Sequence, residues 1–261
     1  MKILLTADLH DRRTWLEWLL KEAHNYELVC IAGDLLDMFA ADEGGQIDHL
    51  RGDWLPKMIA TGVPLAVCSG NHDHGMITWL NHIDVPGKVV GDGSTQLLSF
   101  SSGEQLIVTT CPYYRSFNRR DSTMIELWDQ GARLRDEWFA PWLVLHHEPP
   151  AQFAPKPFTA THWLTHRLQT YRPSFVYSGH IHVWHEILCG SGMGRLVFQC
   201  GAAPRRPETQ LPHPRYRSEH HNAFECCRFK AALVGSKNAS STSWSNLYGL
   251  HHDAGGIRMD S

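Results

Sequence analysis

Short apolar runs that end abruptly in polar clusters are the feature that most constrains how this chain can fold. Within each run the apolar residues are largely consecutive rather than alternating, and segments with helical periodicity lie between the runs. The runs cover residues 2–7, 28–32, 64–68, 142–145 and 174–177. Strands that are buried on both faces show this pattern, because helices cover both sides of a parallel sheet. The pattern therefore predicts an α/β fold in which strands and helices alternate.

The remaining segments add helices and a hairpin to this prediction. Helices are expected from apolar periodicity around residues 47–61, 76–83, 122–139 and 163–171. Pro56 interrupts the first of these patterns, so that helix should start late or kink there. Residues 96–100 and 105–110 are predicted to form a hairpin around Ser-Ser-Gly, and 196–200 to form the last strand.

Polar clusters follow each apolar run, and they contain the candidate functional residues. The clusters are Asp8-Leu-His10, Gly33-Asp34 with Asp37, Gly70-Asn71-His72-Asp73, His146-His147 and Gly179-His180-Ile-His182. In open α/β sheets, ligands bind at the carboxyl ends of the strands. These side chains are therefore expected to converge on one rim of the sheet.

The donor atoms in these clusters indicate a metal centre. They are imidazole nitrogens, carboxylate oxygens and an amide oxygen, without a thiolate, a set that suits Mn, Fe, Zn or a similar divalent ion. The set is too large for one tetrahedral ion and fits two. Two ions about 3.5–4 Å apart are the usual arrangement for displacement at phosphorus.

The five clusters, in this order, resemble the motifs of the calcineurin-like metallophosphoesterases. The resemblance covers roughly residues 1–200 and rests on DxH, GDxxD, GNHD, a histidine pair after a strand, and GHxH. It implies a four-layer fold in which a two-sheet α/β sandwich is flanked by helices. It also implies a dinuclear phosphoesterase, here expected to be a phosphodiesterase, that uses a hydroxide bridging the two ions.

The resemblance also assigns a role to each site residue. It implies that Asp34 bridges the two ions and that His72 contacts the phosphate and protonates the leaving oxygen, with Asp37 orienting His72. Of the histidine pair it favours His146 over His147 as the ligand. The ligands implied for the first ion are Asp8, His10 and His182, and those for the second are Asn71, His146 and His180. Asn71 is also expected to touch the substrate.

Substrate contacts beyond this set stay open. Arg115, with Arg119 and Arg120 nearby, could hold a phosphate because arginine forks match phosphate oxygens, but a solvated loop fits the sequence equally well. Tyr113 and Tyr114 either stack on an aromatic group of the substrate or anchor the loop.

Composition narrows the class of partner and the domain organisation. The formal net charge is −3, so no electrostatic footprint favours nucleic acid or a membrane surface, and a reduced cytoplasmic protein is expected. Residues 1–204 are predicted to form the metallophosphoesterase domain. Residues 205–261 are rich in proline and serine and are predicted to be an irregular tail, and the oligomeric state stays open.

Three alternatives to a phosphodiesterase remain. The chain could be a phosphomonoesterase or phosphoprotein phosphatase, or a nuclease of the same family. It could also be a scaffold that keeps the fold without catalysis. The presence of every expected ligand together with His72 favours an enzyme over a scaffold.

Overall fold

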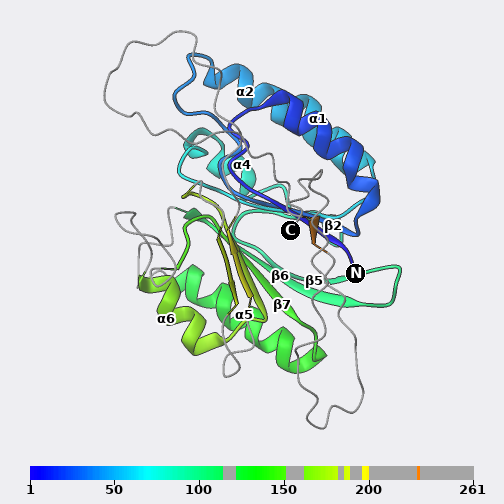
Figure 1. The fold of residues 1–261 in the computed structure, drawn as a ribbon, viewed down its shortest axis with the longest axis vertical. Helices are drawn as coiled ribbons and strands as arrows, with labels where there is room; N and C mark the ends of the chain where they lie inside the picture. Colours follow the sequence, from blue (N-terminus) through cyan, green and yellow to red (C-terminus); the bar gives the residue numbers. More distant parts are fainter. Residues whose placement is uncertain (114–121, 151–161, 182–184, 189–195, 200–227, 230–261) are drawn as a thin grey trace, which may run out of the picture.

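The structure is a computed structural model that describes residues 1–113, 122–150, 162–181, 185–188, 196–199 and 228–229. Two β-sheets lie face to face between layers of helices, as Figure 1 shows. The first sheet has the order β11-β1-β2-β3-β4, in which β1 to β4 are parallel and β11 pairs antiparallel with β1. Its strands are β11 (Arg228–Phe229), β1 (Ile3–Thr6), β2 (Leu28–Ala32), β3 (Leu65–Cys68) and β4 (Val89–Val90).

The second sheet has the order β5-β6-β7-β8-β10-β9. Strands β6, β7, β8 and β10 are parallel, while β5 and β9 pair antiparallel at the two edges. Its strands are β5 (Thr95–Ser99), β6 (Gln105–Cys111), β7 (Trp142–His146), β8 (Phe175–Ser178), β10 (Leu196–Gln199) and β9 (His185–Leu188). The predicted hairpin is the β5–β6 pair, whereas β4 and β9 were not predicted.

Helices cover the outer faces of the sandwich. Helices α1 and α2 lie on one side and α5 and α6 on the opposite side, with the strands between them (Figure 1). The helices are α1 (Arg13–Glu22), α2 (Glu43–His49), α3 (Leu55–Ala60), α4 (Ile77–Leu80), α5 (Ser122–Trp138) and α6 (His162–Tyr171). The predicted α/β sandwich with flanking helices is confirmed.

Burial on both faces explains why the strands are apolar throughout. In β1, Leu5 faces the space between the two sheets, while Leu4 packs against the helix layer that contains α1. In β7, Leu143 faces the other sheet and Val144 packs against α5 and α6. Each fully buried side chain of this size contributes about 1.5–3 kcal/mol of hydrophobic stabilisation. Consecutive apolar residues therefore stabilise two different cores.

Pro56 is accommodated by a change of helix type. Helix α2 passes into a π-helical stretch, Leu50–Trp54, before α3 begins at Leu55. Pro56 then lies in the first turn of α3, directly after the π-helical stretch. The helix does not start late, since helical structure begins at Glu43 and continues through Pro56, with a change of helix type ahead of the proline.

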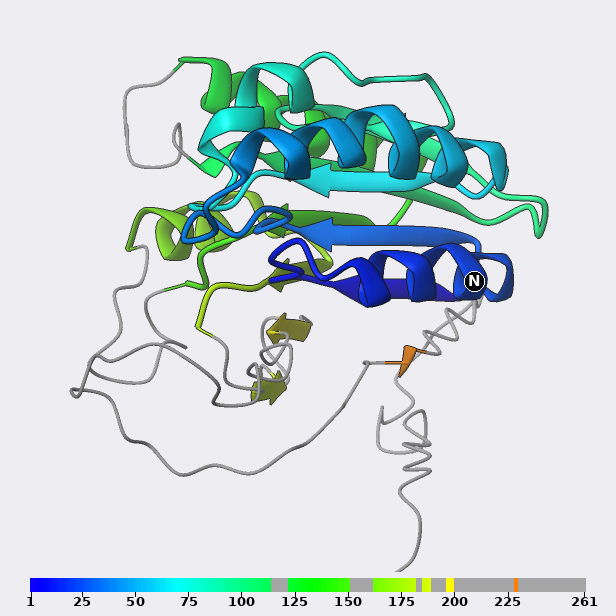
Figure 2. The same ribbon diagram turned by 90° about the horizontal axis from the view of Figure 1, so that it is seen from above.

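The parallel strands end at one edge of the sandwich. Figure 2 shows the arrowheads of β1, β2 and β3 pointing the same way, which brings their carboxyl ends together. The division at residue 204 stays a prediction, because only β11 is described beyond it. Within the part of the chain that the structure describes, no helix is long and apolar enough to cross a membrane.

Candidate metal centre

Backbone hydrogen bonds continue beyond the ends of the strands and align the polar clusters that follow them. The Asp8 N–H donates to the Gly33 carbonyl at 3.0 Å, and the His10 N–H donates to the Asp34 carbonyl at 2.9 Å. In the second sheet, the Gly179 N–H donates to the His147 carbonyl at 2.9 Å. The clusters after neighbouring strands therefore lie side by side on one rim.

Glycines let these strand ends approach closely. A Cβ added to Gly33 would lie 2.5 Å from His147 Nδ1, and one on Gly179 would lie 2.6 Å from the Ala7 Cβ and 2.8 Å from Asp8 Oδ2. A Cβ on Gly70 would meet the Asp34 carboxylate. The glycine that precedes Asp34, Asn71 or His180 is thus a steric requirement of the cluster as well as a turn residue.

Left-handed backbone conformations are concentrated at the same place. Non-glycine residues rarely adopt them, and each costs on the order of 1–3 kcal/mol when the surrounding structure imposes it. At this rim Asp8, His10, Asp34 and His180 have φ values of 56°, 46°, 55° and 76°. The fold therefore holds the polar side chains in strained backbone positions, as is common at functional sites.

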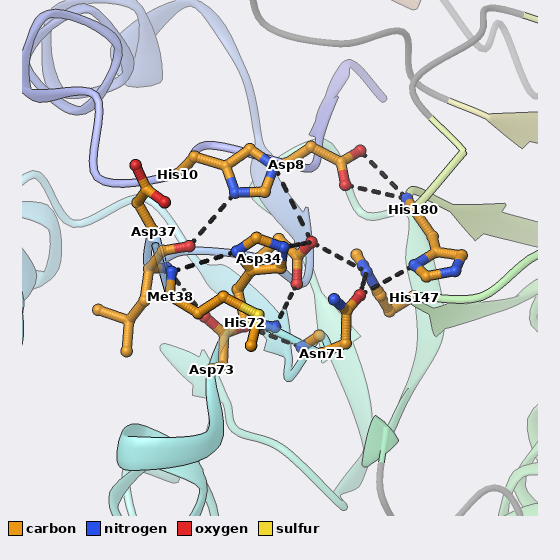
Figure 3. A network of polar contacts seen from close by, with 12 residues as sticks. Asp8, His10, Asp34, Asp37, Met38, Asn71, His72, Asp73, His147 and His180 are labelled. Atoms are coloured by element: carbon orange, nitrogen blue, oxygen red, sulfur yellow. Dashed lines mark hydrogen bonds and ion pairs between the residues drawn. The ribbon is translucent and has the colours of Figure 1, made fainter. Parts of the chain in front are cut away.

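The carboxylate of Asp34 lies at the centre of the cluster. Its Oδ2 is 3.3 Å from His147 Nε2 and 3.9 Å from Nε2 of both His10 and His72, and Figure 3 shows the three rings directed toward it. Its Oδ1 accepts a hydrogen bond from the His72 N–H at 2.9 Å. Burial alone would raise the pKa of Asp34, but His147 and the hydrogen bonds hold that pKa well below its usual range.

His147 is held in an orientation suited to a metal ligand. Its Nδ1 donates to the Ala32 carbonyl at 2.7 Å, so Nε2 faces Asn71 Oδ1 at 3.0 Å and the Asp34 carboxylate. Burial would lower the pKa of His147, but the adjacent Asp34 raises it to about 9. A backbone carbonyl behind Nδ1 is the usual device that orients a ligating imidazole.

His146 lies outside this cluster, so the choice of His146 over His147 is corrected. His146 is fully buried, its Nδ1 donates to the Glu148 carbonyl at 2.6 Å, and its ring lies 6.1 Å from Trp163. Burial lowers the pKa of His146 to about 4. Successive side chains of a strand point to opposite faces, and His146 shares the helix-covered face with Val144. That alternation was a usable signal in the sequence.

His10 and His72 differ in which ring nitrogen carries a proton. His10 Nδ1 donates to the Leu36 carbonyl at 3.3 Å, which leaves the Nε2 lone pair directed at Asp34. His72 Nδ1 instead accepts the Met38 N–H at 3.2 Å, so a neutral His72 carries its proton on Nε2. His10 is thus arranged as a ligand, and His72 as a donor that faces the cluster.

The predicted pairing of Asp37 with His72 is not the arrangement found. Asp37 Oδ1 accepts the Phe39 N–H at 3.0 Å, and in Figure 3 the Asp37 carboxyl group points away from His72. Instead, the backbone N–H of Met38 donates a hydrogen bond to His72 Nδ1. An N–H donor at this nitrogen selects the tautomer opposite to the one that a carboxylate would select.

Asp8, Asn71 and His180 complete the described cluster. The carboxylate of Asp8 is fully buried and accepts the His180 N–H at 2.9 and 3.2 Å. His180 Nδ1 lies 2.9 Å from Asn71 Oδ1, the same oxygen that faces His147. His182 and Arg115 fall outside the described residues, as do Tyr114, Arg119 and Arg120.

Asp73 is a residue that the sequence reasoning did not place in a role. Its buried carboxylate accepts the Leu36 N–H at 3.0 Å and the Gly70 N–H at 2.8 Å, and so ties the loops after β2 and β3 together. Burial and the nearby Asp34 carboxylate raise the pKa of Asp73 to about 6. Its position in Gly70-Asn71-His72-Asp73 was the only available signal.

Tyr113 borders the cluster from the second sheet. Its N–H donates to Ser69 Oγ at 3.0 Å, and its ring lies 5.6 Å from His147 and 6.3 Å from His180. Both contacts are consistent with a side chain that anchors its loop. They also place the ring beside two cluster imidazoles.

The residues present fit divalent cations. Two groups bring side-chain nitrogen and oxygen atoms within 4.8 Å of one another: His10, Asp34 and His72, in which His72 is the proton-bearing member, and Asp8, Asp34 and His147. Asp34 belongs to both groups, as a bridging ligand would. The donors are oxygen and imidazole nitrogen, whereas the described cysteines (Cys30, Cys68 and Cys111) are buried elsewhere, where burial raises the pKa of each thiol.

Comparisons with known proteins agree with this geometry. The chain is similar in fold to TT1561 of Thermus thermophilus, with a TM-score of 0.54, 14% identity, and coverage of 77% of this chain and 89% of that one. It is also similar to GAP50, described as the anchor in the inner membrane complex of Plasmodium, with a TM-score of 0.51, 10% identity, and coverage of 82% and 76%. Similarity at these identities shows the fold alone.

No curated protein matches the chain. The family described as calcineurin-like phosphoesterase matches residues 1–184, so this chain belongs to that family and is a metallophosphoesterase whose His/Asp cluster can bind metal.

Proposed function

We propose that this protein is a phosphodiesterase that works with two divalent ions, Mn, Fe, Zn or similar. The observation that carries the proposal is the difference between the histidines around Asp34. His10 and His147 each have a carbonyl behind Nδ1 and direct Nε2 at the carboxylate, whereas His72 has an N–H behind Nδ1. Two imidazoles are thus arranged to bind cations and one to donate a hydrogen bond from Nε2–H.

The proposed ligand sets keep the assignment implied by the motifs, with one exchange within the histidine pair. Asp8, His10 and Asp34 would hold one ion, together with His182. Asp34, Asn71, His147 and His180 would hold the other, so His147 replaces His146 in the proposed set. When bound, the ions supply positive charge at the phosphoryl oxygens and lower the pKa of coordinated water.

His72 would act on the leaving group. Its Nε2 lies 3.9 Å from Asp34 Oδ2, so the proton on Nε2 faces the proposed metal centre. The Met38 N–H fixes this tautomer, and the His10 ring, 4.5 Å away, limits rotation of the imidazole. A hydrogen bond from Nε2–H to the negative charge that develops on the leaving oxygen contributes about 10²–10³-fold to the rate.

The partial exposure of the cluster allows a diester substrate to reach it. Asp8, Asp34 and His147 are buried, whereas His10, Asn71, His72 and His180 are each partly exposed. A phosphate bound there would thus have solvent-facing room for substituents. A diester needs that room for both of its ester groups, and a monoester needs it for only one.

Hydrolysis by metal-stripped protein that is reloaded with Mn²⁺ tests the proposal. Bis-p-nitrophenyl phosphate and p-nitrophenyl phosphate would be compared for the wild type, His72→Ala and a control, His24→Ala. His24 is an exposed histidine in the turn before β2, at the opposite end of that strand from Asp34. We expect diester turnover that needs metal, falls about 10²-fold or more in His72→Ala and is unchanged in the control.

The other outcomes separate the alternatives. Preference for the monoester would indicate a phosphomonoesterase or phosphoprotein phosphatase, and salt-dependent binding and cleavage of DNA would indicate a nuclease. Folded protein that holds two ions and hydrolyses neither ester would contradict the proposal. It would favour a scaffold, an alternative consistent with the description of the structurally similar GAP50 as an anchor.

A further inference from the structure

An exposed phenyl ring stands beside the proposed hydrogen-bond donor. The side chain of Phe39 is 83% exposed, and its ring lies 5.3 Å from the His72 ring at an interplanar angle of 85°. The preceding residue, Met38, is 51% exposed and provides the N–H that fixes the His72 tautomer. Leaving a phenyl ring in water forgoes about 1.5–3 kcal/mol of hydrophobic stabilisation. The ring is therefore placed at a cost, next to a functional group.

The turn that carries Phe39 is held firmly in place. The buried Gln46 of α2 binds the Asp37 peptide from both sides, because its Oε1 accepts the Asp37 N–H at 2.8 Å and its Nε2 donates to the Asp37 carbonyl at 3.2 Å. The Phe39 N–H donates to Asp37 Oδ1, and the Ala40 N–H donates to the Asp37 carbonyl at 3.1 Å. A backbone fixed at these points holds the Cα of Phe39 in a defined position beside His72.

The charges near this ring limit what can bind there. Asp37 is adjacent in the turn, and the exposed Asp42 and Glu43 begin the helix that follows. Glu43 lies close to the loop after β3, because a Cβ on Gly75 would meet its carboxylate. Acidic neighbours disfavour an anionic group such as a second phosphate. They do not oppose a neutral ring.

We infer that Phe39 is a specificity residue that stacks on the leaving group, and that the substrate class is a phosphodiester whose leaving alcohol carries an uncharged aromatic ring. The inference rests on the proposed function. In the reaction, the bond between phosphorus and the leaving oxygen breaks and a bond between phosphorus and a water oxygen forms. The proton released by that water ends on the leaving oxygen, to which His72 Nε2–H donates a hydrogen bond. An aromatic group on that oxygen lies over the exposed face of Phe39, since flat rings stack favourably on one another.

Binding of two non-hydrolysable ligands tests recognition without turnover. Calorimetry would measure Kd for phenylphosphonate and methylphosphonate on Mn²⁺-loaded protein. We expect the wild type to prefer phenylphosphonate by about tenfold, which corresponds to about 1.4 kcal/mol, and Phe39→Ala to lose most of that preference. The matched control is Phe139→Ala, because Phe139 is 91% exposed and follows the end of α5, in the helix layer on the opposite side of the sandwich from α2. It should keep the preference.

Hydrolysis of two matched diesters supplies the second measurement. Methyl 4-chlorophenyl phosphate and methyl hexafluoroisopropyl phosphate have leaving alcohols of closely similar acidity, and only the first is aromatic. Phe39→Ala should lower kcat/KM for the aryl ester about tenfold and for the alkyl ester less than about threefold, as expected for the loss of one ring contact.

The outcomes distinguish the inference from the proposed function. Equal losses for both esters, or an unchanged phenylphosphonate preference in Phe39→Ala, would overturn the inference while leaving the phosphodiesterase in place. Absence of phenylphosphonate binding to the wild type would overturn it as well. A preference that disappears in Phe39→Ala, in protein that hydrolyses no diester, would support the inference as a binding site and refute the proposed reaction.

Discussion

Substituting Gly33 by alanine tests whether close approach of strand ends builds the metal centre. Gly33 has a φ of +82°, and an added Cβ would lie 2.5 Å from His147 Nδ1 and 2.8 Å from the backbone of Gly70. The left-handed conformation costs an L residue about 1–2 kcal/mol, and the overpacked contact adds about 1–3 kcal/mol. Gly33→Ala should therefore lower the free energy of unfolding by about 2–5 kcal/mol.

Gly62 offers a control that separates the two contributions. It has a φ of +76°, but no atom lies within 4 Å of an added Cβ, and it sits in the turn between α3 and β3, away from the carboxyl end of that strand. Gly62→Ala should lower the free energy of unfolding by about 1–2 kcal/mol through conformation alone. It should also leave Mn²⁺ affinity unchanged.

The assay is denaturant unfolding of both variants in metal-free buffer, followed by Mn²⁺ titration by calorimetry. Gly33→Ala should be less stable than Gly62→Ala by about 1–3 kcal/mol, or about 2–12 °C in unfolding midpoint for a domain of this size. It should also bind Mn²⁺ more weakly, because the new Cβ displaces His147. Equal destabilisation by the two substitutions, with equal metal affinity, would refute the steric argument.

Two further predictions concern the histidine pair. His147→Ala should abolish binding of one of two Mn²⁺ ions. His146→Ala should keep both ions and lower the free energy of unfolding by about 1–3 kcal/mol, because a hydrogen bond and side-chain volume are lost. Metal analysis after dialysis, together with denaturant unfolding, would show the reverse if His146 were the ligand. The pKa of His147 is raised to about 9 in the folded metal-free protein, from an ordinary value of 6.5, so its stabilisation is complete below pH 6.5 and is lost as the pH rises through 9. The unfolding free energy of metal-free protein should therefore fall above about pH 7, by at most about 3 kcal/mol, and a fall of the same size in His147→Asn would contradict this assignment. The raised pKa of Asp73, about 6, acts at lower pH and does not obscure this window.

The protonation of His147 also makes metal binding depend on pH. A ligating imidazole must be neutral, whereas His147 is largely protonated below its raised pKa. Metal binding near neutral pH must therefore displace a proton from His147. The buried pair of Asp34 and His147 thus stabilises the metal-free fold at the expense of metal affinity at low pH.

Much of the fold could be read from the sequence because its strands are buried on both faces. The runs at 2–7, 28–32 and 142–145 are apolar at consecutive positions, and each became a central strand that separates two cores. The edge strands β4 and β9 were missed because they are short: Val89–Val90 is fully buried, but two residues cannot show a strand pattern.

The donor set and its location were also predictable from sequence. Parallel strands deliver their following loops to one edge, so Asp8, Asp34, Asn71 and His180 had to converge once their strands were recognised. The choice within the histidine pair went wrong because it followed a motif and not the strand. Alternation along β7 directs His146 into the helix layer and leaves His147 facing the cluster.

By itself, then, the sequence determined the layered α/β architecture, the order of the strand-end clusters and the chemical type of the ligands, because hydrophobic pattern and residue identity are local properties. Only the tertiary structure decided which ring nitrogen of each histidine faces the centre. That choice depends on backbone partners distant in the chain, such as the Ala32 carbonyl, which is 115 positions from His147, and the Met38 N–H, which is 34 positions from His72. The exposure of Phe39 beside His72 was likewise decided in three dimensions, because it depends on how Gln46 fixes the turn that carries it.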